Sequence, residues 1–206
     1  MIAIVDYNMG NLQSVLNAFR LLGEEVVATK KKEDLQKAKA IILPGVGAFK
    51  DGMQSLEKLG LVDILQEEVL RKKKPFLGIC LGMQLLALKG TEYGDYKGLG
   101  WVKGVCDIIR PDDDSYKIPH MGWNNIQIKK QEGLFENIGE DPVCYFVHSY
   151  SLQPDASEQN IVTSTCFHGQ VIVASIEKEN IFGVQFHAEK SQGAGLKLLE
   201  NFVSLC

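Results

Sequence analysis

The chain has 206 residues, a formal net charge of −4 at neutral pH and 45% hydrophobic residues. This mild acidity gives no electrostatic reason to expect binding to nucleic acid or to an anionic membrane surface. The apolar runs are only as long as strands, and residues 1–6 enter the first strand without a charged start or a cleavage site. We therefore expect no membrane segment and a soluble, unexported protein of the cytoplasm.

A chain of this length predicts one domain, residues 1–206, with a proper hydrophobic core. Its five cysteines are an odd set without a C-x-x-C pair. This pattern argues against a disulfide framework and against a zinc knuckle, so we expect reduced thiols and no bound metal.

The first half of the chain alternates strand and helix patterns. Apolar runs at residues 2–5, 25–29 and 40–43 predict buried strands, and amphipathic patterns at 12–22, 33–39 and 53–74 predict helices. Gly23 stands where a helix-ending glycine is expected. This alternation implies right-handed crossovers, and it predicts an α/β fold with an open, mostly parallel sheet flanked by helices.

Residues 76–84 have the layout of a nucleophile elbow. An apolar run leads into Gly78-x-Cys80-x-Gly82, and a helical pattern of apolar residues follows. The glycines leave room for a tight strand-to-helix turn, and the helix N-terminus favours a thiolate. Cys80 is therefore the candidate nucleophile. The alternative for this residue alone is a small buried hydrophobic side chain, the usual role of a free cysteine.

A nucleophilic Cys80 needs backbone N–H donors for the oxyanion that forms during acyl transfer. One comes from the next residue, Leu81, and the loop with Gly45 and Gly47 is the candidate for the second. A dinucleotide-binding loop is excluded because Lys50 occupies the third glycine position. The alternative for this segment is an ordinary glycine turn without a catalytic role.

Beyond residue 100 the pattern changes. Short mixed segments cover residues 101–128, strand patterns cover 143–150, 161–167, 171–176 and 181–186, and a helical pattern closes the chain. These segments predict an added antiparallel or mixed section in the C-terminal half.

The last strand pattern ends at His187-x-Glu189. His187 can take the proton of a cysteine and return it to a leaving nitrogen, and Glu189 can orient its ring around a strand-end turn. His-x-Glu also occurs in zinc deaminases, but the Pro-Cys-x-x-Cys that they require does not follow. We interpret His148 as a structural residue of a strand, and His120 and His168 as loop or turn residues.

Five motifs together resemble the class I (triad) glutamine amidotransferases. They are Pro44-Gly45-Val46-Gly47, Gly78-Ile79-Cys80-Leu81-Gly82-Met83-Gln84, Pro119-His120-Met121-Gly122-Trp123-Asn124, Val147-His148-Ser149-Tyr150 and Gly183-Val184-Gln185-Phe186-His187-Ala188-Glu189-Lys190. The resemblance spans essentially the whole chain and implies a flavodoxin-like fold. The motifs that begin at Pro44 and Pro119 resemble one branch, the glutaminase subunits of imidazole glycerol phosphate synthase.

The resemblance implies that the chain hydrolyses glutamine to glutamate and ammonia without a cofactor. Cys80 would attack the side-chain amide, His187 would move the proton, and Glu189 would orient the imidazole. The resemblance further implies an oxyanion hole at Gly47 and Leu81 and glutamine contacts from Gly45, Gln84, Ser149 and Tyr150.

The resemblance also implies a heterodimer with a (βα)8-barrel cyclase subunit. That subunit uses the ammonia to make imidazole glycerol phosphate and an aminoimidazole carboxamide ribonucleotide. The residues placed at this interface are Asn11, Trp123, Tyr145 and Lys190. Three alternatives remain: a paralogous glutaminase that feeds a different synthase, for instance one that amidinates a sugar; a cysteine peptidase or chaperone of the same fold; and a non-enzymatic binding module.

Overall fold

The computed structural model describes residues 1–206 and contains two sheets. The strands are β1 (Ile2–Val5), β2 (Val26–Thr29), β3 (Ala40–Gly45), β4 (Phe76–Cys80), β5 (Ala87–Gly90), β6 (Tyr96–Lys97), β7 (Val102–Ile108), β8 (His120–Ile128), β9 (Val143–His148), β10 (Tyr150–Pro154), β11 (Val162–Phe167), β12 (Val171–Lys178) and β13 (Ile181–Val184). The α-helices are α1 (Leu12–Leu21), α2 (Lys32–Lys37), α3 (Phe49–Lys58), α4 (Val62–Leu65), α5 (Leu81–Gln84) and α6 (Gln192–Ser204). A π-helical segment, Gln66–Arg71, continues α4, and short 3-10 turns occupy Gly133–Phe135, Ala156–Ile161 and Ala188–Lys190.

The larger sheet is parallel in one half and antiparallel in the other. Its strand order is β2-β1-β3-β4-β13-β12-β11-β8-β9. The strands from β2 to β13 pair in parallel, and those from β13 to β9 pair antiparallel. The smaller sheet, β10-β7-β5-β6, is mixed. The expected α/β fold, with a mostly parallel part and an added mixed section, is confirmed.

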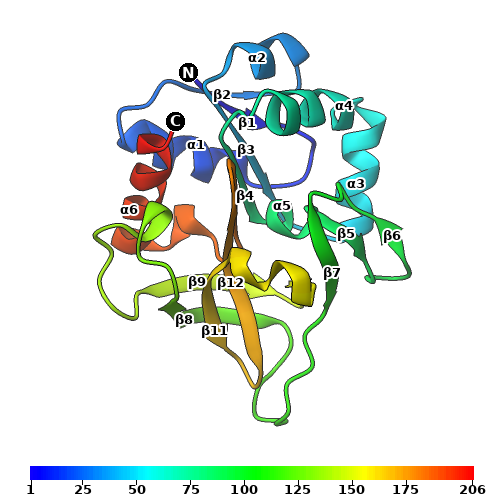
Figure 1. Ribbon diagram of the computed structural model, residues 1–206, viewed down its shortest axis with the longest axis vertical. Coiled ribbons are helices and arrows are strands. Elements are labelled where there is room, and N and C mark those ends of the chain that lie inside the picture. Colours follow the sequence, from blue (N-terminus) through cyan, green and yellow to red (C-terminus); the bar gives the residue numbers. More distant parts are fainter.

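Successive residues of the parallel strands face two separate hydrophobic cores. In β1, Ala3 and Val5 belong to the core under α2, α3 and α4, whereas Ile2 and Ile4 belong to the core under α1 and α6. Figure 1 shows α1 and α6 together on one side of these strands and α3 and α4 on the other. A strand covered on both faces is apolar at every position, which is why these runs are continuous in the sequence.

Two helix predictions are wrong in extent. The pattern at 53–74 is not one helix, because α3 ends at Lys58 and Gly60 turns the chain with a φ of +63° before α4 begins. The helix after the elbow is a single turn, and the chain goes from α5 directly into β5. The carbonyl of Leu86 accepts hydrogen bonds from the backbones of Trp101 and Val102, so long-range pairing replaces the helix that the apolar pattern predicts.

No helix in the structure combines the length and the hydropathy that crossing a bilayer requires.

Candidate active site

Cys80 is held at the strand-to-helix turn in a conformation that few residues adopt. It ends β4 with a φ of 53° and a ψ of −108°, and α5 begins at the next residue. A Cβ on Gly82 would lie 1.7 Å from the carbonyl oxygen of Leu43, and a Cβ on Gly78 would lie 2.7 Å from the carbonyl of Gly82. Only glycine fits at these two positions, so the turn depends on both.

The parallel pairing of β4 with β13 brings the other two candidate catalytic residues to Cys80. Val184 is paired with Ile79, so the carboxyl ends of the two strands meet at the same edge of the sheet. The chain then turns at His187, whose backbone N–H donates to the carbonyl of Tyr145 at 2.9 Å. A strand that comes late in the sequence thus lies directly beside the elbow.

His187 and Glu189 form a buried pair. The distance from His187 Nδ1 to Glu189 Oε1 is 2.8 Å, and both side chains are less than 5% exposed. Because the carboxylate accepts the Nδ1 proton, Nε2 is the nitrogen left to act on another group. It is buried and has no hydrogen-bond partner in the resting site. Burial lowers the pKa of His187, but Cys80 and Glu189 outweigh it and raise this pKa above its ordinary value.

The thiol of Cys80 has two weak contacts of its own. It donates toward the carbonyl oxygen of Val147 at 3.9 Å, and the Nε2 amide of Gln185 donates to the sulfur at 3.7 Å. The side chain of Cys80 is 4% exposed. The sulfur therefore has one N–H donor, the Gln185 amide, and one acceptor, the carbonyl oxygen of Val147.

A cavity of about 450 Å³ opens over Cys80. The parallel half of the molecule and the added section each supply part of its wall. The residues expected at the site that line it are Gly47, Cys80, Leu81, Gln84, Ser149 and Tyr150. Gly45, His187 and Glu189 line a small neighbouring hollow instead, together with Asn11 and Lys190.

The loop with Gly45 and Gly47 lies at the elbow as expected. A Cβ on Gly45 would lie 2.1 Å from the Tyr7 hydroxyl, and Gly47 has a φ of +110°, so neither position accepts an ordinary side chain without strain. Leu81 is the first residue of α5, and its N–H therefore has no acceptor inside the helix. Both candidate sources of oxyanion donors thus border the cavity.

Gln84 presents one particular atom to the cavity. Its Nε2 donates to the carbonyl of Tyr150 at 2.8 Å and to Oε1 of Gln185 at 3.2 Å. Both amide protons are used inside the protein. The carbonyl oxygen of Gln84 is left for a ligand, and it can only accept a hydrogen bond.

Glu92 is a cavity residue that the sequence reasoning missed. It lies in the loop between β5 and β6, lines the cavity over Cys80, and accepts a hydrogen bond from the backbone N–H of Phe49 at 2.8 Å. It is the one carboxylate among the cavity-lining residues. A carboxylate there favours a cationic group on the ligand. No local motif distinguishes Glu92 from other loop carboxylates.

Three of the four expected interface residues lie together on the surface. The ring centroids of Trp123 and Tyr145 are 5.7 Å apart, and Lys190 Nζ lies 5.9 Å from the centroid of the Tyr145 ring. Trp123 is 50% exposed. Asn11, at the start of α1, shares the small hollow with Lys190.

The interpretation of His120 as a loop residue is wrong. His120 begins β8, is 3% exposed, and its Nδ1 lies 2.9 Å from Nε2 of His148. The proline and glycine near it suggested a loop, but strand pairing with β9 places it inside the molecule. His148 is a buried, hydrogen-bonded strand residue as expected, and His168 lies in the turn between β11 and β12.

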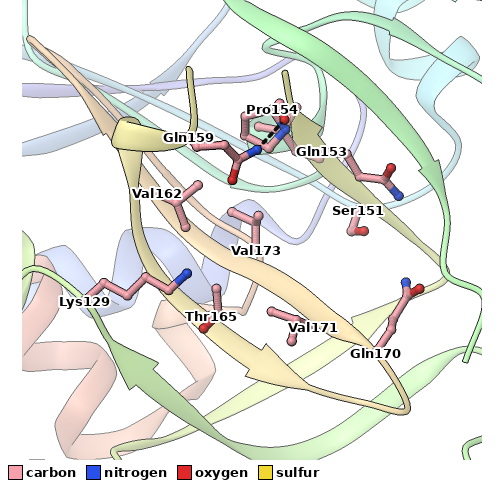
Figure 2. A pocket seen from close by; sticks show the side chains of 11 residues that line it. Lys129, Ser151, Gln153, Pro154, Gln159, Val162, Thr165, Gln170, Val171 and Val173 are labelled. Carbon is pink, nitrogen blue, oxygen red and sulfur yellow. Dashed lines mark hydrogen bonds between the residues drawn. The ribbon is translucent and has the colours of Figure 1, made fainter. Parts of the chain in front are cut away.

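A second hollow lies between β10 and the β11–β12 hairpin, away from Cys80. Figure 2 shows its Ser, Thr, Gln, Val and Lys side chains, and its volume is about 410 Å³. It contains no cysteine, histidine or carboxylate. Its serine and threonine hydroxyls thus have no histidine or carboxylate in the lining to activate them, so the candidate site is the cavity over Cys80.

Comparisons with known proteins agree with this geometry. The family model described as "Glutamine amidotransferase class-I" matches residues 3–205. "Imidazole glycerol phosphate synthase subunit HisH 1" of Campylobacter jejuni subsp. jejuni (strain 81-176) is 47% identical over 206 residues, which is 100% of both chains. The protein named as the HisH subunit in Aquifex aeolicus is 46% identical and covers 97% of this chain and 94% of its own.

Solved structures share the fold at lower identity. A structure titled "Crystal structure of glutamine amidotransferase" superposes with a TM-score of 0.76 at 18% identity and covers 100% of this chain and 98% of its own. The structure of PurLQS from Thermotoga maritima gives a TM-score of 0.72 at 19% identity over 99% of this chain and 97% of its own. With an elbow cysteine, a buried His–Glu pair and a full-length match to the family model, the chain belongs to the class-I glutamine amidotransferase family.

Proposed function

We propose that this chain, as the glutaminase subunit of imidazole glycerol phosphate synthase, hydrolyses glutamine to glutamate and ammonia at Cys80. The proposal is supported above all by the buried His187–Glu189 pair, with its Nδ1–Oε1 distance of 2.8 Å, in the turn that follows β13, the strand next to the elbow. Full-length relatives named as this subunit support the assignment to that enzyme.

The reaction begins with proton transfer from the thiol to His187 Nε2, the buried nitrogen without a partner. The sulfur attacks the side-chain amide carbon of glutamine, and the N–H groups of Leu81 and of the loop at Gly47 stabilise the oxyanion. The imidazolium returns the proton to the amide nitrogen, which leaves as ammonia. His187 then activates a water molecule, which hydrolyses the thioester to glutamate, while Glu189 keeps the ring oriented.

The cavity offers one complementary contact for each polar group of glutamine. Glu92 pairs with the α-ammonium group, since it is the carboxylate of the cavity. The Gln84 carbonyl oxygen accepts from a ligand N–H group, because its amide protons are already used. The segment at Ser149 and Tyr150 holds the amino acid end. Gly45, in the neighbouring hollow with His187, lies on the side of the reacting amide. These contacts orient the substrate over the sulfur.

The ammonia passes to a (βα)8-barrel cyclase subunit in a heterodimer. The exposed Trp123 and the neighbouring Tyr145 and Lys190 give this face an aromatic and cationic character that suits a protein interface, and Asn11 adjoins it. Residues 1–206 act as one glutaminase domain. The five free cysteines fit the reducing cytoplasm, where we place the protein.

The test is glutamate release as the chain is titrated with the histidine-pathway cyclase from the same genome, with and without the nucleotide substrate. Strong stimulation at a one-to-one ratio is the expected result, and Cys80→Ala is the blank. If the cyclase gives no stimulation but a glutamine-mimicking alkylator still labels Cys80, the chain is a glutaminase that feeds another synthase. If neither occurs, the proposal is wrong.

A further inference from the structure

A continuous chain of buried side-chain hydrogen bonds links the sulfur of Cys80 to strand β8. Gln185 Nε2 donates to the sulfur at 3.7 Å, and Gln185 Oε1 accepts from Gln84 Nε2 at 3.2 Å. Gln84 Nε2 also donates to the Tyr150 carbonyl at 2.8 Å. Nδ1 of His148 lies 2.9 Å from the same carbonyl. The exposed fractions of Gln185, Gln84 and His148 are 0%, 5% and 6%.

The chain continues outward through a second histidine. His120 Nδ1 lies 2.9 Å from His148 Nε2, and Asn124 Nδ2 lies 3.1 Å from His120 Nε2. Asn124 also donates to the carbonyl of Phe167 at 2.9 Å. Both His120 and Asn124 are on β8, and the half-exposed Trp123 lies between them in sequence. The outer end of this hydrogen-bond chain therefore lies on the strand that also carries Trp123.

Only one assignment of histidine tautomers and amide orientations gives every donor in this hydrogen-bond chain an acceptor. The Tyr150 carbonyl can only accept, so His148 carries its proton on Nδ1 and its Nε2 is an acceptor. His120 must then donate from Nδ1 and accept the Asn124 amide at Nε2. Both rings are therefore neutral, in agreement with the burial that lowers the pKa of each. Reversing one amide or one tautomer would leave a buried donor facing a donor, which is costly.

We propose that Gln185 is a positioning residue for the reactive sulfur, and that the neutral chain from His120 through His148 and Gln84 holds its amide in the donating orientation. A thiolate gains more than a thiol from an N–H donor, so this contact favours the attacking form of Cys80. Gln84 offers its carbonyl oxygen to the ligand, whereas the side chain of Gln185 contacts only the sulfur and Gln84. The inference rests on the proposed function only in taking Cys80 as the nucleophile.

The first test measures the sulfur itself and does not require glutamine. In Gln185→Met the side chain keeps its approximate size and loses the donor. Alkylation of the full-length protein with iodoacetamide is followed across pH, with the label on Cys80 read by mass spectrometry. We expect the midpoint of Cys80 reactivity to rise by about one pH unit, as the loss of one hydrogen bond to an anion predicts. An unchanged midpoint overturns the proposal.

Two further variants separate positioning from general stability. Asn201 is another buried amide, which donates to the carbonyls of Leu134 and Glu136 far from the sulfur, so Asn201→Leu is the matched control and should leave the midpoint unchanged. If Gln185→Met does not fold, Gln185→Glu keeps the shape and the acceptor for Gln84 and should raise the midpoint further because it adds an anion. An equal shift in Asn201→Leu counts against a specific role for Gln185.

A substitution of His120 tests the outer half of the hydrogen-bond chain. His120→Phe keeps a ring stacked on Phe146 but removes both nitrogens. We expect alkylation of Cys80 at pH 7 to slow by about two- to threefold, the size of coupling typical of residues in one hydrogen-bond network. No change would confine the positioning role to Gln185 and overturn its extension to β8. A midpoint shift in Gln185→Met together with absent glutamate release in the unsubstituted protein would reject the glutaminase and keep the positioning role.

Discussion

The parallel half of the molecule and the added antiparallel section contribute different things to the same cavity. Cys80 ends β4, and His187 and Glu189 lie in the turn after β13, so the groups that would make and break bonds are in the parallel half. Glu92 lies in the loop between β5 and β6 of the smaller, mixed sheet, and the segment from His148 to Tyr150 joins β9 to β10; both line the cavity. The reacting groups thus lie at the carboxyl ends of parallel strands, and the recognition groups come from the segments added beside those strands.

This division predicts that substitutions in the two regions change different kinetic constants. Changes at Cys80, His187 and Glu189 should lower kcat, because they remove groups that act in the transition state. Changes at Glu92 should raise KM, because that carboxylate contacts a part of the substrate that does not react.

The largest effect is expected at the nucleophile. Cys80→Ala should reduce glutamate release by more than about 10⁴-fold, as the loss of a covalent nucleophile generally does. Binding of the proposed cyclase partner should stay intact, since Cys80 is 4% exposed. The assay is steady-state glutamate formation in the complex. Cys206→Ser, at the exposed cysteine, is the control and should retain full activity. Residual turnover of glutamine by Cys80→Ala would remove the elbow from the mechanism.

Removal of the base should lower kcat more than removal of its orienting carboxylate. His187→Ala removes the proton acceptor and should cost about 10⁴-fold in kcat, whereas Glu189→Ala leaves the imidazole in place but misaligned and should cost about 10²-fold. Steady-state kinetics of the two variants measure this order. Equal losses, or a larger loss at Glu189, would contradict these roles.

A substitution of Glu92 tests whether this carboxylate acts in substrate recognition. Glu92→Gln keeps an acceptor for the N–H of Phe49 but removes the charge facing the cavity. We expect KM for glutamine to rise by about ten- to a hundredfold with kcat within a few fold, because a charge-assisted hydrogen bond contributes about 1.5–3 kcal/mol. A fall in kcat with KM unchanged would show that the added section takes part in the chemistry.

The elbow glycines test how rigid the parallel half is. Gly82→Ala places a Cβ 1.7 Å from a backbone oxygen and should lower the free energy of unfolding by about 3 kcal/mol or more. Gly139→Ala, where no atom lies within 4 Å of the added Cβ, is the matched control and should change stability by less than about 1 kcal/mol. Urea unfolding of both variants measures the difference. Similar effects would mean that the turn relaxes.

The smallest expected effect is a pH dependence of stability that arises in the added section. Burial and the neighbouring histidines lower the pKa of His120 to about 3, and burial lowers that of His148 to about 4. Between these values and the unfolded pKa of about 6.5, the unfolded chain binds protons that the folded chain does not. The contribution of these two histidines to the free energy of unfolding is therefore fully present above about pH 6.5 and is lost as the pH falls toward their folded pKa values.

The loss amounts to at most about 1.4 kcal/mol per pH unit for each histidine. Urea midpoints at pH 7 and pH 5.5 should show it, and His120→Phe should reduce the difference between the two midpoints. His187, whose pKa is raised, contributes in the opposite sense, because its contribution to stability is fully present only below the unfolded pKa of about 6.5 and is lost as the pH rises; it therefore offsets part of the difference between pH 7 and pH 5.5. A difference that is unchanged in His120→Phe would locate the titration elsewhere.

The sequence predicts the parallel half better than the added section, for physical reasons. Strands covered on both faces are continuous apolar runs, and the elbow glycines are required by local crowding, so both leave a signal in a few adjacent residues. The His-x-Glu pair is also local. By contrast, Glu92 reaches the cavity through a loop, and the burial of His120 depends on pairing β8 with β9.

The elements that the sequence predicts wrongly are decided by distant partners. The apolar residues after Gln84 suit a helix, but the chain after α5 forms β5 because β7 pairs with it. The break at Gly60 is instead local, because this glycine turns the chain with a φ of +63° between α3 and α4, within a pattern that is amphipathic throughout. Local propensity is a weak signal where such long-range contacts form.

The position of β13 has a consequence for synthesis of the protein on the ribosome. This strand lies near the end of the chain, yet it pairs with β4 and β12 in the middle of the large sheet. Until β13 has been synthesised, the edge of β4 that will pair with it is unpaired. Such an edge can pair with the wrong strand or be bound by chaperones. The base and its carboxylate emerge afterwards, so the nascent chain cannot release ammonia before its sheet is complete.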